Sequence, residues 1–157
     1  MQYLYVLTMF VHLLAAIFWV GGIFLVYMVF RPVAMTQLEP PQRLTMFLGI
    51  FSKFFPWVWV FIVALVISGY TDWIFRLGGF ESPPLYLLAM EIIGWIMIVL
   101  FAWLYFGFCK RFKKHIEDEN FAEAGKVLNS KMRPIIITNL ILGMLEALIG
   151  VSAHYFF

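Results

Sequence analysis

His12 lies in the middle of an apolar run, residues 4–30, that contains no Asp, Glu, Lys or Arg. An ionisable side chain is costly to place in such a run, so by default it marks a functional site. A neutral imidazole is a common metal ligand, and the thioether of Met9, about one helical turn earlier, is a soft donor that suits Cu(I). The pair therefore predicts a metal site, with copper as the first candidate.

Further polar and sulfur-bearing side chains interrupt the later apolar runs or lie at their ends: Asp72, Met90, Glu91, Asn139, Glu146 and His154. Three of them share one helical stripe of the last run. We expect these groups to converge with His12 on a single cavity. The expected metal ligands are His12, Met9, Met90 and Glu91. The groups expected to carry protons or to orient the ligands are Glu146, Asp72 and Asn139.

Each of these residues also has a purely structural interpretation. His12 could hydrogen-bond a neighbouring helix, and Glu91 could be its structural partner. Glu146 could be a protonated hydrogen-bond donor, while His154 lies near enough to a run end to be solvated. These alternatives stay open at the level of the sequence.

The composition decides which elements must position the candidate residues. The chain is 64% hydrophobic and 13% charged, whereas soluble domains carry about 25% charged residues. Four runs, at 4–30, 54–75, 86–108 and 134–157, are long enough to cross about 30 Å of hydrocarbon at 1.5 Å per residue. Backbone polar groups in lipid need internal partners, which favours helices. The sequence predicts an all-α integral membrane protein, a single four-helix domain over residues 1–157.

The positions of the basic residues predict the orientation. Of the eleven Lys and Arg residues, three lie in 31–53, seven in 109–133 and one, Arg76, between the second and third runs. The positive-inside rule then places 31–53 and 109–133 in the cytoplasm and both termini outside. We expect a multi-pass protein of the bacterial inner membrane, with His12 in the periplasm-facing half.

The two cytoplasmic segments should be partly helical. Apolar residues recur at helical spacing from residue 42 onward, which predicts a helix that runs into the second span. Residues 110–114 should prolong the third span, and 120–128 should form a short amphipathic helix. The basic residues of 109–133 are mixed with acids, so we expect contact with anionic lipid and no nucleic-acid partner.

Several motifs resemble the CopD family, the copper-resistance D membrane domain. They are HLLAAIFWVGG at 12–22, RP at 31–32, LEPPQRL at 38–44, FFPWVW at 54–59, SGY at 68–70 and NLILG at 139–143. The resemblance covers almost the whole chain and is closest to the small stand-alone members. It implies copper uptake at the inner membrane with a periplasmic copper-binding partner, and His12 as a ligand. Because larger members have more spans, a four-helix unit is expected to dimerise or to find a partner.

The first run also resembles the four-helix HemJ type of protoporphyrinogen oxidase, which is associated with haem b. That family implies a lysine in the third span and an Asn-Glu-x-Pro beyond it, and this chain has neither. The CopD resemblance is therefore ranked first.

Three functional hypotheses follow. The first is copper binding in a periplasm-facing site, with a role in copper uptake or delivery. The second is a haem b protein, ligated by His12 and His154, for electron transfer or protoporphyrinogen oxidation; it alone includes an enzyme. The third is an assembly or scaffold subunit without a cofactor, whose small-residue stripes mediate helix contacts.

Overall fold

The computed structural model describes the backbone of residues 2–77 and 83–156 and the side chains of residues 3–75 and 83–152. Within these ranges every regular element is helical, and four helical rods are long and apolar enough to cross a membrane. The rods run over Tyr3–Gln37, Pro40–Phe75, Leu85–Glu117 and Phe121–Ser152. The prediction of an all-α protein with four apolar helices is confirmed, and such a set of helices indicates a multi-pass membrane protein.

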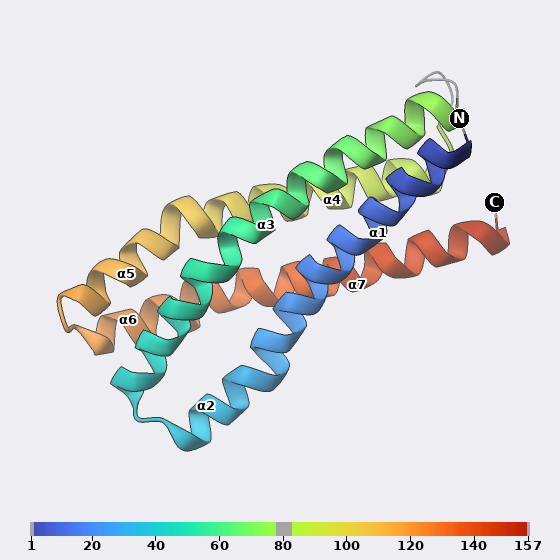
Figure 1. The fold of residues 1–157 in the computed structure, drawn as a ribbon. Coiled ribbons are helices and arrows are strands. Elements are labelled where there is room, and N and C mark those ends of the chain that lie inside the picture. Colours follow the sequence, from blue (N-terminus) through green and yellow to red (C-terminus); the bar gives the residue numbers. More distant parts are fainter. Residues whose placement is uncertain (1, 78–82, 157) are drawn as a thin grey trace.

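All rods except the second are built from consecutive shorter helices (Figure 1). The first contains α1 (Gln2–Phe24), the π-helical η1 (Leu25–Phe30) and α2 (Arg31–Gln37); the second is α3 (Pro40–Leu77). The third contains α4 (Leu85–Trp103), the π-helical η2 (Leu104–Cys109) and α5 (Lys110–Glu117). The fourth contains α6 (Phe121–Val127), the π-helical η3 (Leu128–Met132) and α7 (Arg133–Phe156). The helices predicted from residue 42, over 110–114 and over 120–128 are therefore present, as parts of α3, α5 and α6.

Two of the π-helical segments end at an Arg-Pro pair. Proline lacks an amide hydrogen and its ring clashes with the carbonyl four residues earlier. The preceding turn widens, so that Arg31 N–H donates to Val26 O and Arg133 N–H donates to Leu128 O, each five residues back. Pro32 and Pro134 thus account for η1 and η3, and they place each arginine at the first position of the following α-helix.

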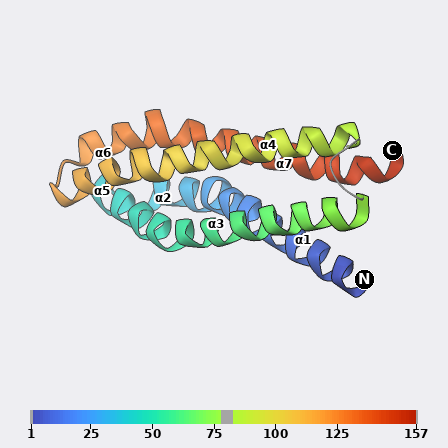
Figure 2. The same cartoon turned by 90° about the horizontal axis from the view of Figure 1, so that it is seen from above.

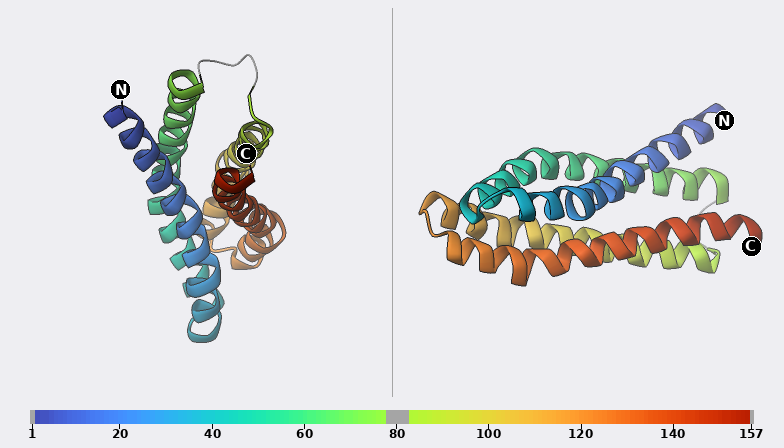
Figure 3. Two further views of the ribbon diagram at one scale, coloured as in Figure 1. Left: turned by 90° about the vertical axis from the view of Figure 1, so that its right-hand side faces the viewer. Right: turned by 90° about the horizontal axis from the view of Figure 1, so that it is seen from below.

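The rods form two antiparallel pairs. α1 packs mainly on α3, α4 packs mainly on α7, and α1 also contacts α7 (Figures 2 and 3). Glycines permit the closest approaches: a Cβ atom at Gly22 would lie 2.3 Å from Phe54 Cζ, and one at Gly143 would lie 2.5 Å from Val20 Cγ2. α1 therefore joins the two pairs through α7, and α3 joins them through ring contacts such as Phe55 with Phe101.

The two ends of the bundle differ in packing. The start of α1 and the end of α7 lie at one end, here called the terminal end, and α2, α5 and α6 lie at the other, here called the basic end (Figure 1). Phe101 is 2% exposed and packs edge-on against Phe55, with ring centroids 5.3 Å apart. Phe51 stacks on Phe55 at 4.9 Å. By contrast, no side chain in residues 85–96 or 144–152 is buried. The aromatic core thus fills the middle and the basic end.

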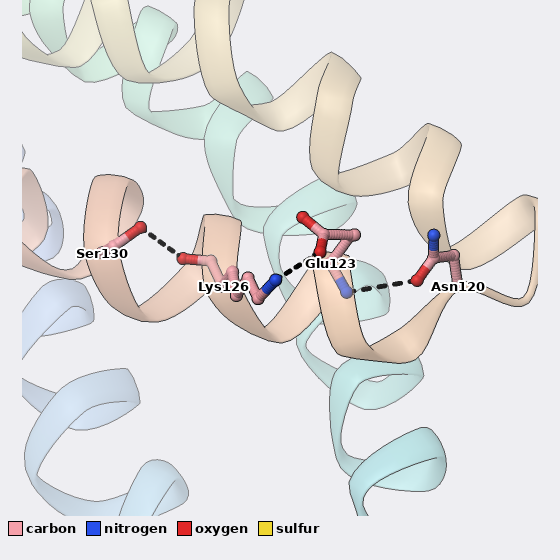
Figure 4. Close-up of polar contacts among 4 residues, drawn as sticks. All are labelled: Asn120, Glu123, Lys126 and Ser130. Atoms are coloured by element: carbon pink, nitrogen blue, oxygen red, sulfur yellow. Dashed lines mark hydrogen bonds and ion pairs between the residues drawn. The ribbon is translucent and has the colours of Figure 1, made fainter.

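A tight turn joins α5 to α6 at the basic end. Glu119 adopts a left-handed conformation with φ of 54°, and Asn120 N–H donates to His115 O at 2.8 Å. The Asn120 side chain then caps α6 by accepting from the Glu123 amide at 3.2 Å (Figure 4). Lys126 donates to the Glu123 carboxylate, which lowers the pKa of Glu123 below its ordinary value. The mixed charges of this helix are therefore paired on its exposed face.

Candidate functional site

The His12 side chain on α1 points at α3 and is half-buried. Its Nδ1 atom lies 2.9 Å from Ser68 Oγ. The Ser68 hydroxyl donates its single hydrogen to backbone carbonyls of its own helix, Ala64 O at 2.6 Å and Leu65 O at 3.2 Å. When the Ser68 hydrogen points at one of these carbonyls, the Ser68 oxygen accepts from His12, and Nδ1 then carries the imidazole proton. In the neutral ring this leaves the lone pair on Nε2, the atom that could bind a metal.

The surroundings of Ser68 fix the position of the ring. His12 Cε1 lies 3.5 Å from the position that a Cβ atom would take at Gly69, so the imidazole rests against the backbone of α3. The ring also interacts with the Leu65 carbonyl, which is close to Ser68 Oγ. A metal-binding histidine is usually oriented by such a hydrogen bond to its other nitrogen.

Asp72 is the acidic group near His12. It follows Ser68 by one turn of α3, is 7% exposed and interacts electrostatically with the imidazole. Its predicted role, as a group that carries protons or orients the ligands, stays a prediction. A negative charge there would favour a cation bound at Nε2.

Glu91 belongs to a different contact. Tyr70 donates its hydroxyl hydrogen to Glu91 Oε1 at 2.6 Å, and Trp95 Nε1 donates to the Tyr70 oxygen at 3.4 Å. Tyr70 and Ser68 are two residues apart on α3, about 200° around the helix, so they face different sides. Glu91 is therefore held by Tyr70 between α3 and α4, and no hydrogen bond or ion pair joins it to His12 in the described chain.

Met90 and Glu146 lie in the contact between α4 and α7. Met90 Cε is 3.6 Å from the position of a Cβ atom at Gly150, and Glu146 Oε1 is 3.8 Å from that at Gly94. Glu146 Oε1 is buried and accepts no hydrogen bond from the described residues. The contacts of the described residues thus divide these groups: His12 contacts α3, Glu91 contacts Tyr70, and Met90 and Glu146 lie between α4 and α7.

Asn139 lies deeper, in the aromatic core. It is 1% exposed, and its Oδ1 atom has no hydrogen-bond partner among the described residues. It lines a cavity of about 20 Å³ together with Trp19, whose Nε1 atom is equally without a described partner. This volume admits a single water molecule.

The remaining candidates give a small donor set. Met9 lies one turn from His12 and is half-buried. No group of three or more His, Cys, Asp or Glu side chains that could hold a metal occurs in the described part of the chain. The side chain of His154, the second expected haem ligand, lies outside the described residues.

The sequence interpretation missed two residues of the site. Ser68 appears in the sequence only within the SGY motif, and its hydroxyl donates to its own helix, so the sequence alone does not single it out. Tyr70 was not recognised as the partner of Glu91. Comparisons of this chain with protein-family models, with curated proteins and with solved structures found no match.

Proposed function

We propose that this chain is a membrane protein that binds copper at His12, in the half of the bundle that bears both termini, and that it takes part in copper uptake or delivery. The observation that carries the proposal is the 2.9 Å hydrogen bond between His12 Nδ1 and Ser68 Oγ, which occupies Nδ1 and leaves Nε2 as the nitrogen that could bind a metal. The resemblance to the CopD family supports the same assignment and a periplasmic copper-binding partner.

The donor set suits Cu(I) better than other metals. His12 supplies an imidazole nitrogen, and Met9, three residues earlier on the same helix, supplies a thioether. Soft thioether ligands select Cu(I), which also accepts two ligands, whereas structural zinc sites need four. Met90 and Glu91 do not fit this site, since they contact Gly150 and Tyr70 instead. The ligands are therefore His12 and Met9, with Ser68 and Asp72 in support.

The packing favours binding and delivery over passage of an ion through the bundle. Between His12 and the basic end, the interior consists largely of close-packed aromatic and aliphatic side chains, including Phe55 and Phe101. Among the described residues, Asn139 is the buried polar side chain of this core. The cavity beside it admits only a single water molecule. Copper would enter and leave at the terminal end.

The test is copper binding by the full chain, purified in detergent. The wild type is expected to bind one Cu(I) in competition with a coloured Cu(I) chelator, and His12→Ala is expected to lose it. His115→Ala is the matched control, because His115 lies in α5 at the basic end. Equal copper binding by wild type and His12→Ala would contradict the proposal.

A haem b protein is the second candidate, because the described surroundings of His12 offer one free imidazole nitrogen, which is what an axial haem ligand requires. A porphyrin is far larger than the 20 Å³ cavity, so it would occupy the space between the helix pairs or their lipid-facing surface. A Soret band that His12→Ala abolishes would select this candidate. With neither copper nor a Soret band, the scaffold hypothesis would replace both.

A further inference from the structure

Two arginines from distant parts of the chain meet at one tyrosine at the basic end. The Cζ atoms of Arg31 and Arg133 lie 5.6 Å and 5.9 Å from the centroid of the Tyr27 ring. Arg133 Nε also donates to the Tyr27 hydroxyl at 3.2 Å. Two guanidinium groups that share one ring repel each other, so their convergence raises the question of what neutralises them.

Among the described residues, no carboxylate forms an ion pair with either arginine. The described ion pairs of the basic end join Lys113 to Glu117 and Lys126 to Glu123, and neither arginine makes one. Arg31 donates no hydrogen bond to any described residue, and Arg133 uses only Nε. Most of the guanidinium N–H groups therefore remain available for an anion.

The other ionisable side chains near the turns at this end do not neutralise the positive charge of the two arginines. Glu39, Asp118 and Glu119 lie in the turns at this end, are exposed and form no ion pair with either arginine in the described chain. Lys131, in η3 just before Arg133, is exposed and adds a further positive charge. The net charge beside Tyr27 is thus positive.

A small cavity borders both arginines. It has a volume of about 30 Å³, and its lining is mostly apolar, with Tyr27, Arg31, Asn129 and Arg133 among the residues that border it together with apolar residues such as Phe47. The volume corresponds to about two water-sized oxygen atoms. Because the cavity lining is mostly apolar, a phosphate group would lie outside it, against the guanidinium groups of the two arginines. Arginine forks match the geometry of phosphate oxygens.

The same local backbone structure positions both arginines. Each follows a π-helical turn and precedes a proline, so each guanidinium projects from the first residue of an α-helix at the boundary of an apolar run. In a membrane this boundary is the level of the lipid phosphates. The positive-inside rule further assigns this end to the leaflet that is rich in anionic lipid.

We propose that Arg31, Arg133 and Tyr27 form a binding site for a phosphate group at the basic end of the bundle. The phosphate would come from the headgroup of an anionic phospholipid or from a free phosphate anion. The two guanidinium groups would hold oxygens of the phosphate, while the Tyr27 ring contacts both of them. The proposal is independent of copper binding, since its residues lie at the opposite end from His12.

The experiment is native mass spectrometry of the full chain, released from detergent after incubation with phosphatidylglycerol, with phosphatidylcholine or with inorganic phosphate. The test variant is Arg31→Gln with Arg133→Gln. The control variant is Arg43→Gln with Arg111→Gln, which removes the same charge from other sites at the same end. We expect wild type and control to retain one phosphatidylglycerol and the test variant to retain at least tenfold less.

The arms of the experiment distinguish the source of the phosphate. Retention of phosphatidylglycerol without binding of inorganic phosphate identifies a lipid headgroup, and binding of both identifies a general phosphate site. Equal lipid retention by test and control variants, or equal retention of phosphatidylcholine and phosphatidylglycerol, would overturn the proposal. If the double variant fails to fold, Arg31→Lys and Arg31→Gln are compared: the site requires that lysine retain more lipid than glutamine does.

Discussion

The two ends of this bundle differ in the side chains that make their helix contacts. At the basic end and in the middle, interlocked rings such as Phe51, Phe55 and Phe101 exclude polar groups and hold the four rods together. Toward the terminal end, α4 and α7 present no fully buried side chain over 85–96 and 144–152, and the polar side chains pair across helices. The residues of the close-packed core and those of the proposed copper site thus lie in different halves. We therefore expect substitutions in the core to change mainly the stability of the fold, and substitutions at the site to change mainly copper binding.

The largest effect is expected from Phe101→Ala. Phe101 is 2% exposed and packs against Trp19, Phe55 and Trp59. Removing the ring from a close-packed core costs about 3–5 kcal/mol. Unfolding in mixed detergent, followed by circular dichroism, measures the loss. Phe106→Ala, at a ring that is 58% exposed on the same rod, should cost much less. Equal losses for the two variants would refute the division between core and periphery.

Ser68→Ala tests the terminal half. The variant removes the acceptor for His12 Nδ1–H, so the imidazole can exchange its tautomers and turn. Loss of such an orienting group weakens metal binding about 10- to 100-fold, while the unfolding free energy should change by about 1 kcal/mol. Competition with a Cu(I) chelator measures the affinity. Ser68→Thr keeps the hydroxyl and should bind Cu(I) as the wild type does. Unchanged Cu(I) affinity in the alanine variant would show that Ser68 does not orient His12 for metal binding.

A smaller effect is expected where α1 joins the helix pairs. A Cβ atom at Gly143 would lie 2.5 Å from Val20 Cγ2, whereas one at Gly21 meets nothing within 4 Å. Gly143→Ala should destabilise the fold, because overpacking costs about 1–3 kcal/mol and the gain in helix propensity is about 1 kcal/mol. Gly21→Ala should stabilise it slightly. The same unfolding assay gives both signs, and a stabilising Gly143→Ala would show that the pairs are not held closely there.

The smallest effect concerns the pH dependence of α6. The hydrogen bond from Lys126 lowers the pKa of Glu123 below its ordinary value of 4.5. A carboxyl group with a lowered folded-state pKa stabilises the fold above pH 4.5, and the stabilisation is lost as the pH falls through the lower value. The protection of the amides of residues 121–127, measured as their exchange rate relative to that of an unstructured peptide at the same pH, should therefore fall on acidification in the wild type. Glu123→Gln should remove this pH dependence and leave exchange in α3 unchanged.

The helices could be predicted from the sequence because lipid imposes one requirement on every backbone group in it. An uninterrupted apolar run satisfies that requirement only as a helix, and the extensions from residue 42 and over 110–114 follow from apolar spacing. The π-helical turns were not predicted, although the Arg-Pro pairs at 31–32 and 133–134 that explain two of them are plain in the sequence.

The site was harder to predict, for a physical reason. Helical spacing indicates which residues share a face of one helix, but not which neighbour that face meets. Glu91 and Glu146 were both expected beside His12, yet Tyr70 holds the first and α7 packs the second against Gly94. Ser68 escaped notice because a serine that donates to its own helix carries no signal until a partner is seen.

A π-turn contains one residue more than the α-helical turn it replaces, so η1 and η3 act as insertions that the helix absorbs without breaking. The faces of α1 and α2, and those of α6 and α7, are therefore displaced by about 100° from the phase that an unbroken helix would give. A hydrophobic stripe traced straight through Leu25–Phe30 would predict the wrong side of α2. If these rods are transferred to another scaffold, each proline must be kept with its π-helical turn, or Arg31 and Arg133 will no longer meet at Tyr27.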